Sequence, residues 1–298
     1  MAIHTLRKHL QQKGFYYGMV APLVVIMLAL YAYPVVNSIY MTFMKYNYVA
    51  MDSRPVWIGM QNFVNFVKSP DGRQVIFNTL TFTFIVVFIE TVLGLSLALV
   101  FNKEFLGRGV ARALVLVPLM LAPVVVGYEW RWLYNDPYGL INIALIHLHV
   151  IEAPIAFTTS AKFAMASLMV ADIWYATPFV AVLCMGGLQS LPEEPFESAI
   201  IDGASAVQRF LYITLPLLRP VLMAAILIRA MDAFQTFDLV FILTYGGPGN
   251  LTELMNTFTY KVAFHNFDLG YASTISVVSL ILMMLIGLAL LRITRRNA

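Results

Sequence analysis

Seven ionisable side chains lie inside long apolar stretches of this sequence. A charged group in hydrocarbon is costly, so each is a candidate for substrate contact or for an ion pair between helices. The seven are Glu90, Glu129, Arg131, Asp172, Arg229, Asp232 and Asp238. Glu129 and Arg131 stand beside Trp130 and Trp132, a pattern that favours anchoring at a membrane surface. Glu90 stands alone among apolar residues, and we expect it to face another helix.

The densest polar group lies at 232–238, where aromatic rings alternate with hydrogen-bonding side chains. It contains Asp232, Phe234, Gln235 and Asp238. Sugars suit this mixture, because rings cover their C–H faces while amides and carboxylates bind their hydroxyl groups. Gln235 and Asp238 are three residues apart, which predicts one shared face of a helix. The alternative is that these groups hold helices together.

A second polar group contains Asp172 and Tyr175, within the sequence ADIWYATPF. Packing between helices and contact with a sugar are equally consistent with it. Arg229 and Asp232 are three residues apart, so a local ion pair is one expectation. A pore for a phosphorylated solute would require unpaired cations, and Asp232 would neutralise Arg229. The pattern therefore favours a neutral sugar or oligosaccharide.

The elements that position these side chains must cross a membrane. Of the 298 residues, 60% are hydrophobic and 12% are charged, and the mean hydropathy is +0.78. Soluble domains carry about 25% charged residues, so a soluble fold could not bury this much apolar surface. The net charge of +3 is too small to indicate a nucleic-acid partner. The single cysteine, Cys184, excludes an internal disulfide and a multi-cysteine metal site, and no pattern indicates a cofactor.

Six apolar stretches are long enough to cross a bilayer, which takes roughly 20 residues. The prediction is an all-α polytopic membrane protein with spans in 16–43, 74–102, 113–128, 163–192, 220–245 and 269–291. The side that holds both termini carries 11 Lys and Arg residues and the other side carries 7, so we expect both termini in the cytoplasm. One membrane domain would cover 16–294, between cytoplasmic ends at 1–15 and 295–298.

The loop at 191–220, on the predicted cytoplasmic side, reads LPEEPFESAIIDGASAVQRFLYITLPLLRP. Its first prolines and glutamates suit the start of a helix. Gly203, followed by Ala204 and Ser205, allows a sharp turn and the close approach of another backbone. A second helical stretch would continue to Pro216. We expect a helix-turn-helix that fits a groove on a soluble partner. An ordinary amphipathic loop is the alternative.

The same loop resembles the EAA motif of ABC importer permeases. The motif begins at Glu197-Ser198-Ala199, with Ser198 in place of an alanine. Gly203 follows after three residues, and Ile213-Thr214-Leu215-Pro216 follows after nine more. Other fragments, such as WIGMQNFVNF, EWRWLYNDPYGLIN and FDLVFILTYGGPG, are similar to carbohydrate-uptake importers of the maltose and glycerol-phosphate type.

This resemblance implies the type I permease fold of ABC importers, with a cytoplasmic coupling helix that docks on an ATPase. The implied coupling residues are Glu197, Ala199, Asp202, Gly203, Ala204 and Ser205. The implied partners are a second permease subunit, an ATP-binding cassette ATPase dimer, an extracytoplasmic solute-binding protein and membrane lipid. The short basic end LLRITRRNA resembles that of the first permease in such systems, so we expect a heterodimer in a bacterial or archaeal plasma membrane.

No GxxxxGK[ST], HExxH or GxSxG pattern occurs, so we expect a transport subunit that is not itself an enzyme. The expected solute is a sugar or oligosaccharide, and glycerol-3-phosphate or another polyol-type solute is the alternative. A secondary transporter would leave the 197–216 pattern unexplained, and no spacing supports an intramembrane enzyme that uses Asp172 and Asp232.

Overall fold

The computed structural model describes residues 17–49 and 54–295, which divide into two compact units. The smaller unit contains residues up to Phe66 together with Val262–Val277, and the larger contains Val67–Lys261 and the residues from Val278 onward. The predicted cytoplasmic ends, 1–15 and 295–298, lie outside the described residues except for Arg295.

The smaller unit begins with a helix over Tyr17–Met41. A π-helical turn, Leu28–Ala32, directly precedes α2 (Tyr33–Met41). Pro34 stands in the first turn of α2. Because proline cannot donate to the preceding turn, the backbone widens there.

A short hairpin follows in the same unit. β1 (Met44–Lys45) pairs antiparallel with β2 (Val56–Trp57). The side-chain amide of Asn62, in α3 (Gln61–Lys68), donates to the carbonyl groups of Thr42 and Met44 at 3.0 and 2.9 Å. The backbone of Leu269 donates to Tyr46 at 2.9 Å, which joins the hairpin to the start of α14 (Leu269–Arg295).

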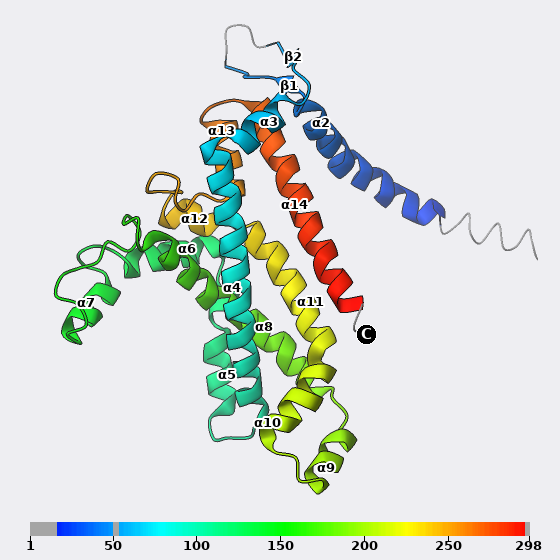
Figure 1. Ribbon diagram of the computed structural model, residues 1–298, viewed down its shortest axis with the longest axis vertical. Helices are drawn as coiled ribbons and strands as arrows, with labels where there is room; N and C mark the ends of the chain where they lie inside the picture. The colour runs from blue at the N-terminus through cyan, green and yellow to red at the C-terminus, as the bar shows by residue number, and fades with distance from the viewer. Residues whose placement is uncertain (1–16, 50–53, 296–298) are drawn as a thin grey trace, which may run out of the picture. The chain divides into compact units, whose positions relative to one another are not determined.

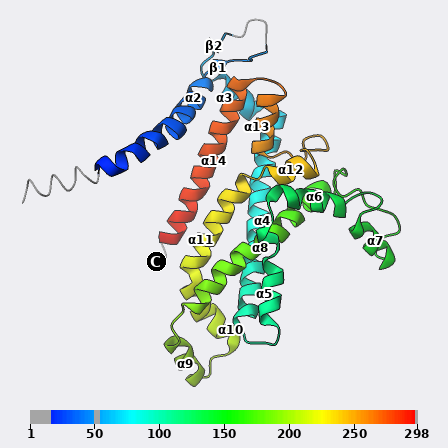
Figure 2. The same cartoon turned by 180° about the vertical axis from the view of Figure 1, so that it is seen from behind.

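The larger unit is built around three long helices that pack side by side, as Figures 1 and 2 show from opposite sides. They are α4 (Pro70–Asn102), α8 (Ala164–Gln189) and α11 (Leu215–Phe234). The shorter helices are α5 (Arg108–Leu116), α6 (Pro123–Leu133), α7 (Leu140–His147), α9 (Glu194–Ile201), α10 (Ala206–Arg209), α12 (Asp238–Leu243) and α13 (Met255–Phe264).

Apolar side chains fill the space between these long helices. One cluster includes Phe82, Leu168 and Ala233, and a second, nearer α9 and α10, includes Val180 and Leu218. Alanines such as Ala98, Ala171, Ala225 and Ala230 recur in both clusters. Small residues let helix backbones approach closely, which is how helices associate in lipid.

Five described helices are long and apolar enough to cross a membrane. They cover Tyr17–Met41, Pro70–Asn102, Ala164–Gln189, Ala206–Phe234 and Leu269–Thr294. The predicted span at 113–128 is not one continuous helix: α5 ends at Leu116, a 3₁₀ turn covers Pro118–Met120, and α6 begins at Pro123. The two prolines account for this break, because each removes a backbone donor. The six-span topology therefore stays a prediction.

The predicted span at 220–245 is also shifted along the chain. The helix begins at Ala206 and ends at Phe234, and it passes through a π-helical turn at Phe210–Thr214. The predicted loop therefore leads directly into a helix that is long and apolar enough to cross a membrane.

Candidate functional site

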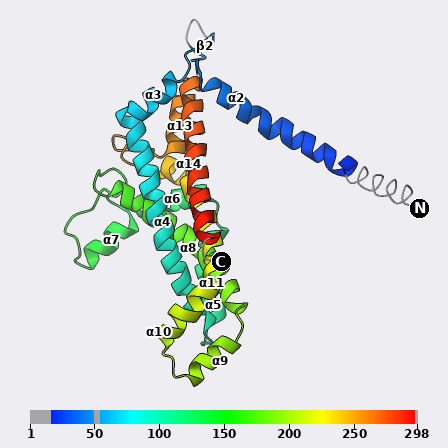
Figure 3. The same cartoon turned by 45° about the vertical axis from the view of Figure 1, so that its right-hand side comes forward.

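The predicted helix-turn-helix at 191–220 is confirmed, and it lies at one end of the larger unit (Figure 3). α9 ends at Ile201, and Asp202 caps it. Gly203 has a φ of +77°, a left-handed conformation that glycine adopts without strain. The turn closes when the backbone N–H of Ala204 donates to the carbonyl of Ala199 at 2.9 Å.

The second helix of this turn starts with a capping box. The Ser205 hydroxyl accepts from the backbone of Gln208 at 3.3 Å, and the Gln208 side chain accepts from the backbone of Ser205 at 2.8 Å. Apolar side chains stand in solvent around it, with Ile201 85% and Val207 66% exposed. The turn is thus a rigid, apolar projection.

A buried ion cluster joins the three long helices of the larger unit. Arg229 of α11 donates through Nε to Glu90 Oε2 at 2.8 Å and through Nη2 to Glu90 Oε1 at 3.0 Å. The same Nη2 donates to Asp172 Oδ2 of α8 at 3.1 Å. All three residues are buried. The expectation that Glu90 faces another helix is confirmed.

The local pair predicted for Arg229 and Asp232 is the weakest contact of this cluster. Asp232 Oδ2 lies 3.8 Å from Nη1 of Arg229, and its side chain is 60% exposed. Asp172 is held inside the cluster, whereas Tyr175 is half-buried against the apolar core. The structure thus links Asp172 to Asp232 through one guanidinium group.

The predicted helical face of Gln235 and Asp238 is wrong, because the helix stops between them. α11 ends at Phe234, and α12 begins at Asp238. The Asn256 side chain donates to the Gln235 carbonyl at 2.7 Å and so satisfies the end of the helix. Phe234 is only 1% exposed, so it belongs to the core.

Three aromatic rings lie next to this break: one, Phe237, belongs to the predicted 232–238 group, and two, Phe241 and Tyr260, do not. Phe237 stacks on Phe241, with ring centres 5.3 Å apart, and the edge of Tyr260 meets both rings at 5.4 Å. The Gln235 amide lies 3.2 Å from the sulfur atom of Met283. Asp232, Gln235 and Asp238 all keep some exposure. The break therefore combines accessible polar groups with a group of aromatic rings.

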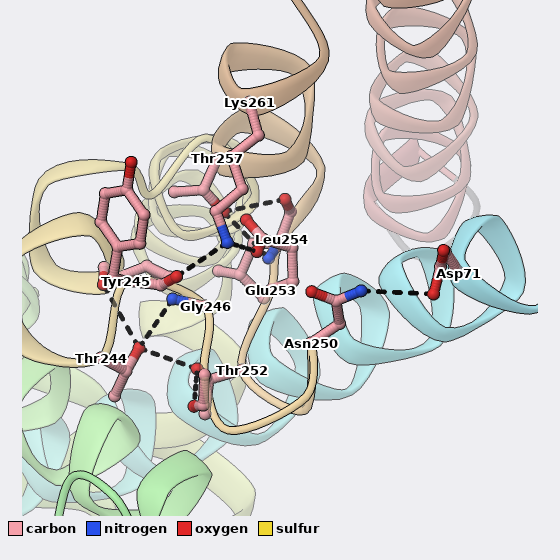
Figure 4. A network of polar contacts seen from close by, with 12 residues as sticks. Asp71, Thr244, Tyr245, Gly246, Asn250, Thr252, Glu253, Leu254, Thr257 and Lys261 are labelled. Carbon is pink, nitrogen blue, oxygen red and sulfur yellow. Dashed lines mark hydrogen bonds and ion pairs between the residues drawn. The ribbon is translucent and has the colours of Figure 1, made fainter. Parts of the chain in front are cut away.

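The loop after α12 forms a third polar network (Figure 4). Glu253 is fully buried and pairs with Lys261, whose ammonium group also donates to the Tyr245 carbonyl at 2.8 Å. Gly246 has a φ of +78°, and a Cβ atom there would overlap the Glu253 carboxylate.

This loop is also fixed to α4. The Asn78 side chain donates to the carbonyl groups of Asn250 and Glu253, both at 3.1 Å, and the Asn250 amide donates to Asp71 at 3.2 Å. The Gly-Gly-Pro-Gly sequence at 246–249 is typical of a turn, which the structure shows, but it gives no sign of these distant partners.

A family model, "Binding-protein-dependent transport system inner membrane component", matches residues 90–297 of the chain. The trehalose/maltose transport system permease protein MalF of Thermococcus litoralis is 34% identical over 280 residues, which cover 94% of this chain and 93% of that protein. The trehalose transport system permease protein SugA of Mycobacterium tuberculosis is 33% identical and covers 87% of this chain and 82% of its own length.

A sulfoquinovosyl glycerol transport system permease protein, SmoG of Agrobacterium fabrum, is 32% identical and covers 93% of this chain and 89% of its own length. Among solved structures, a chain of a bacterial ABC transporter involved in the import of the acidic polysaccharide alginate has the same fold, with a TM-score of 0.84. It is 21% identical and covers 98% of this chain and 99% of its own.

Proposed function

Because the chain belongs to the family of binding-protein-dependent transport system inner membrane components, we propose that it is the membrane permease of an ATP-driven ABC importer for a sugar or oligosaccharide. It is a multi-pass membrane protein, and the sugar permeases among its relatives support this class of solute.

The observation that carries the proposal is the exposed turn between α9 and α10. Gly203 lets the backbone reverse without a side chain, and apolar residues such as Ile201 stand exposed beside it. Such a projection can insert into a groove on the surface of a soluble subunit. We infer that Glu197, Ala199, Asp202, Ala204 and Ser205 meet an ATPase there, on the cytoplasmic side.

The proposed complex contains this chain, a second permease subunit, two ATPase subunits and an extracytoplasmic solute-binding protein. A solved structure of an alginate ABC transporter with the same fold is described as a complex with an alginate-bound periplasmic protein, which supports this assembly. ATP hydrolysis belongs to the ATPase partner, and both termini of this chain face the cytoplasm.

The break between α11 and α12 is the proposed sugar contact. Its open carboxylate and amide groups, from Asp232, Gln235 and Asp238, suit hydroxyl groups, and the nearby rings of Phe237 and Tyr260 suit C–H faces. Phe234 and Asp172 are buried, so they support this surface from beneath and do not form part of it. Tyr175 is partly buried at its border.

The charges of this region favour a neutral solute over glycerol-3-phosphate. A phosphate would need a free cation, but Arg229 already binds Glu90 and Asp172. The same ion cluster argues against an intramembrane enzyme, because Asp172 is held by the guanidinium group.

Transport assays with reconstituted vesicles test the proposal. Vesicles that contain this chain, the second permease and the ATPase should take up a sugar only when the solute-binding protein and ATP are both present. The single chain should neither hydrolyse ATP nor transport. Uptake by the single chain without ATP would refute the proposal in favour of a secondary transporter.

A further inference from the structure

A groove of about 890 Å³ runs along the outside of α4, α5 and α8 in the larger unit. Ile89, Leu93 and Leu97 follow one side of α4 at four-residue spacing and form its floor. These three residues extend about 12 Å along the helix axis. Ligand clefts in proteins enclose roughly 300–1,000 Å³, so the groove is large enough to hold a ligand.

The lining of this groove suits hydrocarbon. Thr177 lines it, but its hydroxyl already donates to the Ile173 carbonyl at 2.6 Å. Trp130 also lines it, and its Nε1 has no partner among the described residues. Trp174 lines it too, so the groove offers two indole N–H groups, which are fewer than the several hydrogen-bonding groups that a sugar requires. The groove is therefore no continuation of the proposed sugar path.

Two arginines stand at one end of the groove. Arg108 and Arg112 lie one turn apart on α5, and Val115, which lines the groove, continues the same face. Arg112 donates through Nη2 to the carbonyl of Phe101 at 2.6 Å, which holds its guanidinium group against the end of α4.

The charge of these guanidinium groups is not neutralised by an acidic side chain among the described residues. Both are half-buried, and the buried Nε atoms of Arg108 and Arg112 have no hydrogen-bond partner in the part of the chain that the structure describes. No ion pair among those residues includes either arginine. Two unpaired cations beside an apolar groove match a molecule that has an anionic head and a hydrocarbon tail.

We propose that this groove binds one acyl chain of an anionic phospholipid, whose phosphate lies on Arg108 and Arg112. α5, which begins at Arg108, lies at the same end of the larger unit as α9 and α10, as the three views agree (Figures 1–3). That end is the proposed cytoplasmic side, where anionic lipids are concentrated.

Charge decides between a lipid and the other candidate occupant, a helix of the second permease. An apolar helix would fill the groove but leave both guanidinium groups without an anion. A phospholipid fills the groove and neutralises them, because a phosphate oxygen accepts hydrogen bonds from arginine directly.

The test uses the assembled transporter in nanodiscs of phosphatidylethanolamine with increasing phosphatidylglycerol, and native mass spectrometry counts the lipids that stay bound. Four forms are compared: wild type, the double variant Arg108→Gln/Arg112→Gln, the groove variant Leu93→Trp and the control Arg73→Gln at the other end of α4. Each basic residue is expected to contribute about fivefold in lipid affinity, and the pair about 25-fold.

Wild type and the control should retain one phosphatidylglycerol, the double variant should need about 25-fold more, and Leu93→Trp should lose it with both arginines intact. Equal retention by all four forms, or no retained lipid in wild type, would overturn the proposal. A cross-link between a cysteine at Val117, which lines the groove, and the second permease would show that a protein helix occupies the groove instead, and would overturn it as well.

Discussion

Arg229 binds Glu90 through two parallel hydrogen bonds, with Nε 2.8 Å from Oε2 and Nη2 3.0 Å from Oε1. This geometry fixes both planar groups, so the two helices that carry them, α4 and α11, are held in one register. Asp172 adds α8 to the same contact. We infer that the three helices move as one body during transport.

Removal of the Arg229 guanidinium group should weaken the packing of α4, α8 and α11. Arg229→Met leaves Glu90 and Asp172 buried without a cation, which costs about 3–5 kcal/mol in comparable buried pairs. We expect a large drop in the thermal stability of the purified complex. Arg292→Met, at an exposed position of α14, is the control and should change little.

A compensating variant separates the charge effect from the loss of packing. Arg229→Met combined with Glu90→Leu and Asp172→Asn removes the unpaired charges, and stability should return to near the wild-type value. A triple variant as unstable as Arg229→Met alone would contradict the ion-cluster explanation.

The loop after α12 should depend on Gly246 for two reasons. Its φ is +78°, and a Cβ atom would overlap the Glu253 carboxylate. Gly246→Ala should therefore break the Glu253–Lys261 pair and lower stability by more than the ~1–2 kcal/mol of left-handed strain alone. Gly249→Ala measures that strain, because its φ is +54° but its Cβ would meet open space. Equal stability loss in the two variants would mean that crowding contributes nothing.

Gly203 should matter for coupling rather than for folding. A Cβ atom there meets nothing within 4 Å in this chain, although φ is +77°. Gly203→Leu should insert normally but lose most of its uptake and its solute-stimulated ATP hydrolysis. Gly203→Asn, which tolerates the left-handed conformation, should keep more of both. Normal uptake by vesicles that contain Gly203→Leu would show that no partner approaches this turn.

Substrate contact at the helix break predicts a change in the concentration dependence of uptake. Gln235→Ala and Asp238→Asn each remove one hydrogen-bonding group, which costs about 1–3 kcal/mol when a ligand was bound there, or roughly ten- to hundredfold in apparent affinity. The control is Glu129→Gln, at an exposed position of α6. If both variants assemble and keep wild-type concentration dependence, the region around Tyr175 becomes the better candidate.

The proposed orientation predicts which surface positions a membrane-impermeant thiol reagent can reach. Ile201 is 85% exposed next to the coupling turn, and Tyr138 is 80% exposed between α6 and α7. In a Cys184→Ala background, a cysteine at position 138 should react in intact cells, and one at position 201 only after lysis. The reverse pattern would place α9 outside.

The coupling turn could be predicted from the sequence, because its signals are local. Gly203 marks the left-handed residue, and Ser205 with Gln208 forms a capping box three residues apart. Such hydrogen bonds join neighbours in the chain, so spacing alone indicates them.

The ion cluster and the helix break could not be predicted in the same way. Glu90 and Arg229 are 139 residues apart: Glu90 stands alone in its own stretch, and the sequence offered Arg229 only the local partner Asp232. Gln235 and Asp238 have helical spacing, but the helix ends between them. There the side chain of Asn256, from a later part of the chain, donates to the Gln235 carbonyl. Long-range packing decides both features, and a periodic pattern along one segment carries no information about it.

The unbroken helix from Ala206 to Phe234 has a mechanical consequence. Its 29 residues make a shaft about 43 Å long, with the coupling turn at one end and the proposed sugar contact at the other. A tilt of about 5° at Gly203 would swing the far end by about 4 Å, roughly the width of one side chain. The π-helical turn at Phe210–Thr214 is then the point where this helix can flex. Its stiffness therefore determines how much of a motion at the coupling turn is transmitted to the proposed sugar contact.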